Sequence, residues 1–339
     1  MRVAFDVTCL TQSRAGTARL ARGLLSALEG TLDLEIVELG ETVRHGRGSV
    51  AQKRAVLQQD LGWYGGGLAR AARNSRAGCL HCPTFRAPLR RARLPTVVTV
   101  HDLAVLREPA WFPRWSRSYG QKLMPRAVRG ADRVVCVSRS TADDVVRLLH
   151  VPEQRIRVIP NGIDALFSTP AAPPPIEGPY LLAVATPEPR KNLDRLLLAH
   201  SLLRAAGRHE RLVLVGADGW GGVELANRPG VVALGRVEDP VLRDLYAGAE
   251  ALIFPSLWEG FGLPVGEALA TGCRIVCSDL PMLREIAGAD ATYCDPLSAQ
   301  GIADAIAQSL AGPRPSPRRE LTWERTASAV VDLWRELAG

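Results

Sequence analysis

The chain has 339 residues, of which 47% are hydrophobic, and it contains seven cysteines and a net charge of +7. This length predicts two domains, each large enough for its own core, and the odd number of cysteines favours a reducing compartment over a disulfide framework. Because no run approaches the roughly 18 apolar residues of a membrane-spanning helix and an apolar strand opens the chain where a signal peptide would lie, we expect a cytoplasmic protein.

The positive charge is concentrated in the first half of the chain. Residues 1–165 contain 26 Lys and Arg against 14 Asp and Glu, a balance of +12, whereas the remaining residues contain 16 against 21, a balance of −5. No nucleic-acid-binding motif accompanies this charge, so we expect no nucleic-acid partner. An anionic membrane surface or a phosphorylated acceptor fits the charge better, and simple solubilisation is the alternative.

Strand and helix patterns alternate from the start, which predicts an α/β protein with parallel sheets covered by helices on both faces. Residues 40–78 are the exception: we expect acceptor-side loops there, with a helical stretch at 50–59 and a mobile run of three glycines at 65–67. In the first half we expect strands at 3–7, 36–39, 79–82, 96–100, 133–137 and 156–159, and helices at 18–28, 115–129 and 142–149, the last capped by Ser140 or Thr141.

Two positions in this half follow strands, where open α/β sheets bind ligands. Gly16 lies between the strand at 3–7 and the next helix, and His101 directly follows the strand at 96–100. Both are candidate site residues, although a core or turn histidine remains the alternative for His101. Cys79 and Cys82 have the spacing of half a zinc or redox site, but no second pair matches them, which favours a core strand.

The helix at 115–129 mixes aromatic and basic residues. Trp115 and Tyr119 lie among Arg114, Arg117 and Lys122, a composition typical of helices on membrane surfaces, and Pro125 interrupts the pattern. An ordinary domain helix with solvated arginines is the alternative.

A proline-rich stretch at 169–179 predicts a linker and the clearest domain boundary. We therefore expect one domain at 1–165, together with a C-terminal helix at about 321–339, and a second at 166–320. In the second we expect strands at 180–185, 211–215, 231–234, 251–254, 275–277 and 291–293, with a helix at 193–206.

The segment at 255–272 combines a buried strand end, a polar turn and a helix start. Gly260 and Gly262 allow close approach of a ligand, and Pro264 suits the first helical position, so free N–H groups at 261–265 should attract phosphate. Glu259 and Glu267 flank this anion site, which fits a ligand whose phosphates lie between two sets of hydroxyl groups, such as a nucleotide sugar. The alternative is that Glu267 only complements the helix dipole and Glu259 is a solvated turn residue.

Two adjacent cations, Arg190 and Lys191, lie at a second strand-to-helix turn in the sequence Glu-Pro-Arg-Lys-Asn. They would complement a diphosphate, although a surface pair of this kind is common.

The string Glu-Gly-Phe-Gly-Leu-Pro followed by Ala-Leu-Ala-Thr-Gly-Cys, with glutamates at 259 and 267, resembles the signature of the retaining glycosyltransferases of family four, which have the GT-B fold of two facing Rossmann-like domains. The turn at 188–192 and the segment after His101 resemble the family's matching loops. The resemblance implies that the first domain binds the acceptor, that the second binds the donor, and that the C-terminal helix crosses back to the first.

The same resemblance implies roles for individual residues. Glu259 would hold hydroxyl groups of the donor sugar, Glu267 the ribose, and the amides of Phe261, Gly262 and Leu263 the diphosphate. Five further positions complete the implied site: Gly16 would face the donor phosphates and acceptor, His101 the transferred sugar, Lys191 with Arg190 the diphosphate, and Val237 the base. Many relatives have a further arginine where this chain has Ala185, and Arg190 is expected to compensate.

We therefore expect a hexosyltransferase that retains configuration and needs neither a cofactor nor a metal, since no Asp-x-Asp occurs. GDP-mannose is weakly favoured as donor over UDP-glucose and dTDP-rhamnose, and the acceptor is a lipid-linked, polysaccharide or small molecule, with the enzyme at the inner face of the membrane. A nicotinamide-dependent oxidoreductase would need Gly-x-Gly-x-x-Gly after the first strand, which is absent. A non-catalytic nucleotide-sugar-binding protein remains the alternative.

Overall fold

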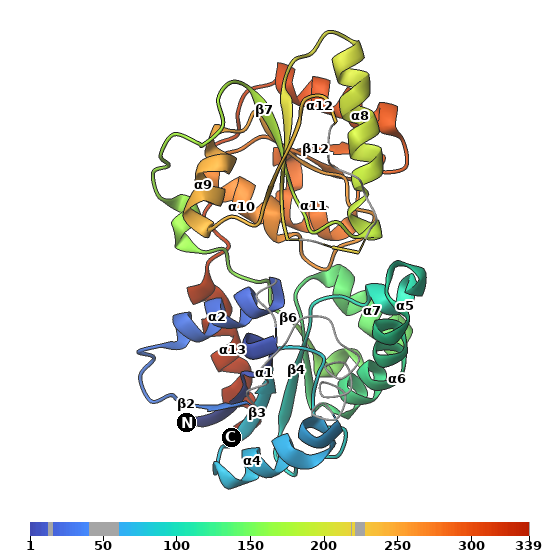
Figure 1. Ribbon diagram of the computed structural model, residues 1–339. Coiled ribbons are helices and arrows are strands. Elements are labelled where there is room, and N and C mark those ends of the chain that lie inside the picture. Colours follow the sequence, from blue (N-terminus) through green and yellow to red (C-terminus); the bar gives the residue numbers. More distant parts are fainter. Residues whose placement is uncertain (13–15, 41–60, 218, 221–227, 339) are drawn as a thin grey trace. The chain divides into compact units, whose positions relative to one another are not determined.

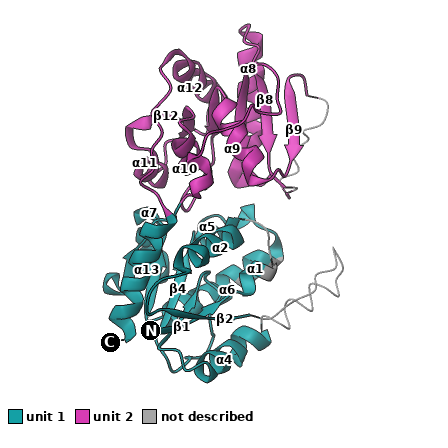
Figure 2. Cartoon of the chain, turned by 90° about the vertical axis from the view of Figure 1, so that its left-hand side faces the viewer, with its two compact units in different colours: residues 1–162, 323–339 teal, residues 163–322 magenta. Residues whose placement is uncertain are grey.

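In a computed structural model the chain forms two compact units, Met1–Gly162 with Trp323–Gly339 and Ile163–Thr322 (Figure 2). The structure describes residues 1–12, 16–40, 61–217, 219–220 and 228–338, and the predicted helix at 50–59 lies outside them. Within this part of the chain, no helix combines the length and apolar character needed to cross a bilayer.

Unit 1 is built on a six-stranded parallel sheet in the order β2-β1-β3-β4-β5-β6 (Figure 1). The chain first adds β2 on one side of β1 and then adds every later strand on the other side, so the topology reverses between β1 and β3. The strands are β1 (Arg2–Asp6), β2 (Glu35–Leu39), β3 (Cys79–Cys82), β4 (Thr96–Val100), β5 (Arg133–Cys136) and β6 (Ile156–Val158).

Helices cover both faces of this sheet, as the alternating pattern predicts. On one face α2 (Gly16–Leu28) and α13 (Trp323–Ala338) pack on Val3, Phe5 and Val97. On the other face α4 (Leu68–Asn74), α6 (Arg114–Gly130) and α7 (Arg139–Leu149) enclose a second apolar cluster. The described shorter helices of the unit are α1 (Thr8–Gln12), a π-helix at Trp63–Gly67, α5 (Ala104–Arg107), and the 3-10 turns Pro109–Trp111 and Glu153–Arg155.

The C-terminal helix α13 therefore belongs to the first unit, as predicted. Its Trp334 is fully buried, and the indole N–H donates to His81 Nδ1 on β3 at 3.1 Å. Cys79 and Cys82, at either end of β3, are buried free thiols that belong to different apolar clusters, which agrees with their interpretation as core residues.

Unit 2 repeats the architecture with the strand order β12-β11-β10-β7-β8-β9, again parallel throughout. Its strands are β7 (Tyr180–Val184), β8 (Arg211–Val215), β9 (Val231–Gly235), β10 (Ala251–Phe254), β11 (Ile275–Ser278) and β12 (Ala291–Cys294). Helices α8 (Leu193–Ala205) and α12 (Ala299–Ala311) pack on one face, while α9 (Asp239–Gly248), α10 (Leu263–Thr271) and α11 (Pro281–Ala287) cover the other. Three 3-10 turns, Ala165–Ser168, Pro189–Lys191 and Gly288–Asp290, complete the described elements.

The proline-rich stretch at 169–179 is not the linker. The chain passes between the units at Gly162–Ile163 and again at Thr322–Trp323, and the stretch lies within unit 2. There the N–H of Ala172 donates to Asp244 Oδ1 at 3.0 Å, and Pro174 packs so closely against Gly248 that a Cβ on this glycine would lie 2.5 Å from its ring. The prolines therefore rigidify a segment that lies along α9, and the crossing itself is made by residues without a proline signal.

Two further expectations about helices were wrong. The run of glycines at 65–67 lies in a π-helical turn that is kinked at Gly66 (φ 176°), and the hydroxyl of the neighbouring buried Tyr64 donates to Asp6 Oδ2 at 3.0 Å. The cap of α7 is Ser138, whose side chain accepts from the N–H of Thr141. The expected helix at 115–129 is confirmed: α6 continues through Pro125, since Met124 and Val128 are buried in the unit 1 core and their packing outweighs the local cost.

Candidate functional site

In unit 2 the topology reverses between β7 and β10, which are neighbours in the sheet. Open α/β sheets bind ligands at such a point, outside the carboxyl ends of the strands. The loops that leave these two ends are 185–192 and 255–262, and they contain the turn and the glutamate segment that the sequence singles out.

The first loop is fixed to the second by Asn192. This residue adopts a left-handed conformation (φ 59°) and is buried, and its Nδ2 donates to Pro255 O at 3.0 Å and to Pro296 O at 2.7 Å. The N–H of Leu257 also donates to the Arg190 carbonyl, at 2.7 Å. Sequence reasoning did not assign Asn192 a role, although asparagine before a helix is among the few residues that tolerate this conformation.

Three predicted residues come together where the two loops meet. Lys191 Nζ lies 2.5 Å from Glu259 Oε1, and Arg190 Nη1 lies 3.2 Å from Glu259 Oε2. Arg190 Nε also pairs with Glu188 at 2.8 Å, and Lys191 Nζ lies 5.1 Å from the centre of the Phe254 ring. The site therefore holds two cations that two carboxylates position and partly neutralise.

The charge state of Glu259 follows from this cluster. Burial by itself would raise the pKa of its carboxyl, but the charges of Lys191 and Arg190 outweigh burial, and the pKa lies below its ordinary value. Burial lowers the pKa of Lys191, and the Glu259 carboxylate opposes that effect. Glu259 is therefore ionised at neutral pH, and anything that draws the cations away from it must supply negative charge of its own.

The start of α10 provides backbone donors beside this cluster. Among the described residues, the N–H groups of Phe261, Gly262 and Leu263 have no hydrogen-bond partner, as expected for an anion-binding helix end. The expectation for Val265 was wrong, because its N–H donates to Gly262 O at 2.9 Å and closes the first turn. Gly262 has φ 93°, and a Cβ there would lie 2.6 Å from Leu283 Cδ2, so only glycine fits.

Glu267 lies one turn into α10 and is almost completely buried. The hydroxyl of Tyr246 on α9 donates to its Oε2 at 2.9 Å. Tyr246 was not among the predicted residues, because nothing in its local sequence marks it and only the packing of α9 on α10 brings the two together. Val237 lies in the half-buried turn after β9, at the edge of the sheet and two strands from β7. The roles of Glu267 and Val237 remain predictions.

In unit 1, Gly16 begins α2 and His101 follows β4 at the carboxyl edge of the sheet. His101 Nε2 lies 2.9 Å from the carbonyl of Pro83, which can only accept, so this nitrogen carries the proton. Burial lowers the pKa of the ring, and the Pro83 carbonyl and Asp102 oppose this in part. His101 is therefore a neutral Nε2–H tautomer at neutral pH.

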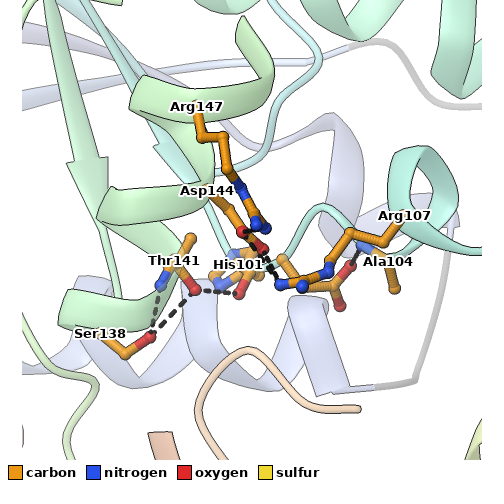
Figure 3. A network of polar contacts seen from close by, with 8 residues as sticks. His101, Ala104, Arg107, Ser138, Thr141, Asp144 and Arg147 are labelled. Carbon is orange, nitrogen blue, oxygen red and sulfur yellow. Dashed lines mark hydrogen bonds and ion pairs between the residues drawn. The ribbon is translucent and has the colours of Figure 1, made fainter. Parts of the chain in front are cut away.

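A polar network at the start of α7 holds the backbone around His101 (Figure 3). The Thr141 hydroxyl donates to the His101 carbonyl at 3.4 Å, and Asp102 Oδ1 accepts from the N–H of Ala104 at 3.0 Å. Beside them the buried Asp144 binds Arg107 at 3.0 Å and Arg147 at 2.6 Å. The position of His101 thus depends on contacts with α7 that are remote in sequence.

Comparison with known proteins places this geometry in a family. Residues 4–165 match the family described as Glycosyltransferase Family 4, and residues 178–311 match Glycosyl transferases group 1. The O-antigen chain mannosyltransferase B of Escherichia coli is 33% identical over 71% of this chain and 68% of that protein. The chain belongs to the family-four glycosyltransferases. The predicted enzyme class is therefore confirmed.

Further relatives support the same placement. The serotype-specific mannosyltransferase WbdA of Escherichia coli is 31% identical over 68% of this chain, which spans only 32% of that longer protein. Two solved structures show the same GT-B fold over 99% of both chains in each comparison. They are a sucrose-phosphate synthase from Thermosynechococcus elongatus (TM-score 0.78, 19% identity) and the catalytic domain of starch synthase IV from Arabidopsis thaliana (TM-score 0.72, 13% identity).

Proposed function

We propose that this glycosyltransferase moves a hexose from a nucleotide-diphosphate sugar held by unit 2 to a lipid-linked, polysaccharide or small-molecule acceptor, with retention of configuration. The observation that supports this most directly is the cluster of Lys191, Arg190 and Glu259 beside the three unpaired N–H groups at the start of α10. A diphosphate fits such a site because it brings the negative charge needed to compete with Glu259 for the cations.

The chemistry follows from what these groups can stabilise. As the bond between the sugar and the diphosphate breaks, negative charge grows on the leaving phosphate, where Lys191, Arg190 and the amides of Phe261, Gly262 and Leu263 would meet it. Glu259, released from its cations, would accept hydrogen bonds from hydroxyl groups of the sugar. Because the cations supply the positive charge, we propose that the reaction needs no metal; in the described part of the chain, no three His, Cys, Asp or Glu side chains gather as metal ligands would.

GDP-mannose is the donor we favour, because the relatives with the highest identity reported above are mannosyltransferases. Glu267 would hold the ribose and Val237 would lie near the base.

The basic first half suggests where the acceptor comes from. Arg70 and Arg73 of α4 line a hollow of about 920 Å³ together with Arg90 and Arg91, and no acidic residue is among its described lining residues. We propose that this part of unit 1 docks on anionic lipid from the cytoplasmic side. The side chains of Trp115 and Tyr119, which the sequence suggests as membrane anchors, lie outside what the structure describes.

A thermal-shift panel tests the donor assignment. GDP-mannose, UDP-glucose and dTDP-rhamnose are each added to the wild type and to Lys191→Met. A ligand present at about 100 times its Kd stabilises the fold by about 2.7 kcal/mol, so the preferred donor should raise Tm clearly in the wild type and much less in the variant. No shift with any nucleotide sugar, or the same shift in both proteins, would contradict the proposed site.

A further inference from the structure

A small, partly open cavity lies beside His101 in unit 1. Its volume is about 30 Å³, and its polar lining residues are His101, Thr99, Asn161 and Thr326, while the remaining walls are mostly apolar side chains of α2, β5 and α13. A space of at least about 10–15 Å³ holds one water molecule if polar groups line it. The cavity is therefore large enough for ordered water.

Two polar atoms in this lining have no partner. His101 Nδ1 and Asn161 Nδ2 are both buried, and neither forms a hydrogen bond with any described residue. Leaving such a group without a partner costs about 1–3 kcal/mol, so a folded chain rarely tolerates two in the same cavity. Because His101 Nε2 carries the proton, Nδ1 presents a lone pair, whereas the Asn161 amide presents hydrogens. The two atoms are complementary but do not bond each other in the structure, and one water molecule could serve both by donating to Nδ1 and accepting from the amide.

A third polar group in the lining, the Thr99 hydroxyl, can donate a hydrogen bond into the cavity. The Trp334 indole can only donate, so the contact of 3.1 Å fixes His81 Nδ1 as the acceptor, and His81 Nε2 therefore donates to the Thr99 hydroxyl at 2.9 Å. Burial lowers the pKa of His81 to about 3, so this ring stays neutral and keeps that arrangement. The hydroxyl hydrogen of Thr99 is then available to a group in the cavity.

We propose that one ordered water in this cavity donates to His101 Nδ1 and accepts from Asn161 Nδ2 and the Thr99 hydroxyl. Asn161 is thereby a positioning residue: it holds the His101 ring in one orientation and as the Nε2–H tautomer without touching substrate. The effect on turnover rests on the proposed function and on the predicted contact of His101 with the transferred sugar, whereas the water and the tautomer do not.

The cavity also adjoins both places where the chain leaves unit 1. Asn161 precedes Gly162, the last residue before the first crossing, and Trp323, another lining residue, is the first after the second crossing. The segments beyond them pair in unit 2, where the N–H of Ile163 donates to Leu321 O at 2.9 Å. Asn161 and Trp323 thus lie next to two segments that are bonded to each other.

The experiment uses the full chain and two readouts other than activity. A crystal structure of the wild type should show a water peak in the cavity. Nitrogen NMR of the histidine rings, with the His101 signals assigned by their loss in His101→Gln, should show Nδ1 unprotonated and hydrogen-bonded. In Asn161→Leu, which fills the space with an apolar side chain, the peak should vanish and the Nδ1 signal should lose its hydrogen-bond shift, while kcat falls about tenfold with little change in KM for the donor.

Thr326→Val is the matched control, because the Thr326 hydroxyl lines the same cavity but already donates to Pro160 O at 2.8 Å. It should leave the NMR signals of His101 and kcat unchanged. Thr99→Val removes a partner of the water without touching Asn161 and should shift the Nδ1 signal in the same direction as Asn161→Leu.

A dry cavity in the wild type, or unchanged kcat in an Asn161→Leu protein that has lost the hydrogen bond at Nδ1, would overturn the proposal. If the wild type turned over no nucleotide sugar, the proposed function would be wrong. The NMR and crystallographic results would still show whether the water is present and bonded to His101 Nδ1.

Discussion

At the scale of single residues, Glu259 and Lys191 define what the proposed donor site can do. Their carboxylate and ammonium groups lie 2.5 Å apart in a largely buried setting. A buried pair of this kind adds little net stability by itself, because desolvation offsets most of the attraction. In the proposed function each charge changes partner when the donor binds: the diphosphate takes the place of Glu259 at Lys191, and sugar hydroxyl groups take the place of the cations at Glu259.

The first prediction concerns Lys191→Met, which removes the charge and keeps most of the side-chain volume. Loss of one group that stabilises developing charge should lower kcat by about 10²–10³, with a smaller effect on KM. Lys122→Met is the matched control, since Lys122 is exposed on α6 and should be dispensable for turnover with a soluble acceptor. Wild-type kcat for Lys191→Met at saturating donor would show that the diphosphate role is misassigned.

The second prediction concerns Tyr246→Phe, which deletes only the hydroxyl that binds Glu267. If Glu267 holds the ribose, loss of this contact should raise the donor Kd several-fold, because the carboxylate is no longer fixed. Tyr180→Phe provides the comparison: its buried hydroxyl donates to Leu245 O at 2.7 Å and does not contact Glu267. Each variant should lose about 1 kcal/mol of stability, but calorimetric titration should show weaker donor binding only for Tyr246→Phe. Equal donor affinities in both variants would argue against the ribose role.

At the scale of elements, the sequence predicts the strands well, because most of them are short apolar runs and those in the middle of each sheet are covered on both faces. The ranges of β3, β4, β8 and β10 are the same as predicted, and the other strands differ by one residue at one or both ends. Prediction from the sequence fails where tertiary contacts decide the local structure. The helical turn at Trp63–Gly67 depends on Asp6, and the segment at 169–179 depends on α9. Propensity in such segments gives no sign of a partner that is distant in the chain.

The same limit applies to the donor site. The glutamate segment and the Arg-Lys turn could be found from local sequence, because glycine, proline and charge have fixed meanings at a helix start. The pairing of Glu259 with both cations could not be found in this way, because it depends on β7 and β10 being neighbours in the sheet. Asn192 and Tyr246 likewise contribute through contacts across elements.

The third prediction concerns the glycine that begins α10. Gly262→Ala should destabilise the protein and weaken donor binding, because the residue is left-handed and a Cβ would collide with Leu283. Gly178→Ala separates the two causes, since Gly178 has φ 72° and no atom within 4 Å of a built Cβ, so it should cost only the roughly 1–2 kcal/mol of backbone strain. Chemical denaturation and donor titration of both variants provide the measurement. Equal losses of stability in the two variants, with unchanged donor affinity in Gly262→Ala, would contradict this prediction. They would mean that the start of α10 can accommodate a Cβ.

At the scale of the whole molecule, the charge balance predicts docking on anionic lipid. Each Lys or Arg that reaches the surface contributes roughly 1 kcal/mol, and the attraction fades with salt. The full chain should float with anionic vesicles at low salt and be released near about 0.5 M salt, and Arg90→Glu with Arg91→Glu should abolish flotation.

The control for this experiment makes the same change in charge on unit 2. Arg204→Glu with Arg319→Glu replaces two exposed arginines there, and flotation should persist because the acidic half is not expected to face the lipid. Equal recovery with neutral vesicles would show that charge does not drive binding. Loss of flotation in both double variants would show that binding depends on total charge and not on a docking surface of unit 1. Either result would contradict the prediction.

The most direct test of the central claim follows the donor itself. The wild type is incubated with the nucleotide sugar that gives the largest thermal shift, in the presence of EDTA, and proton NMR follows both nucleoside diphosphate release and the configuration at the anomeric carbon of the first sugar product. We expect release without added metal, a product with the configuration of the donor, and a rate about 10²–10³ lower in Lys191→Met. Release that requires manganese, or a product of inverted configuration, would contradict the mechanism built on Lys191, Arg190 and the start of α10.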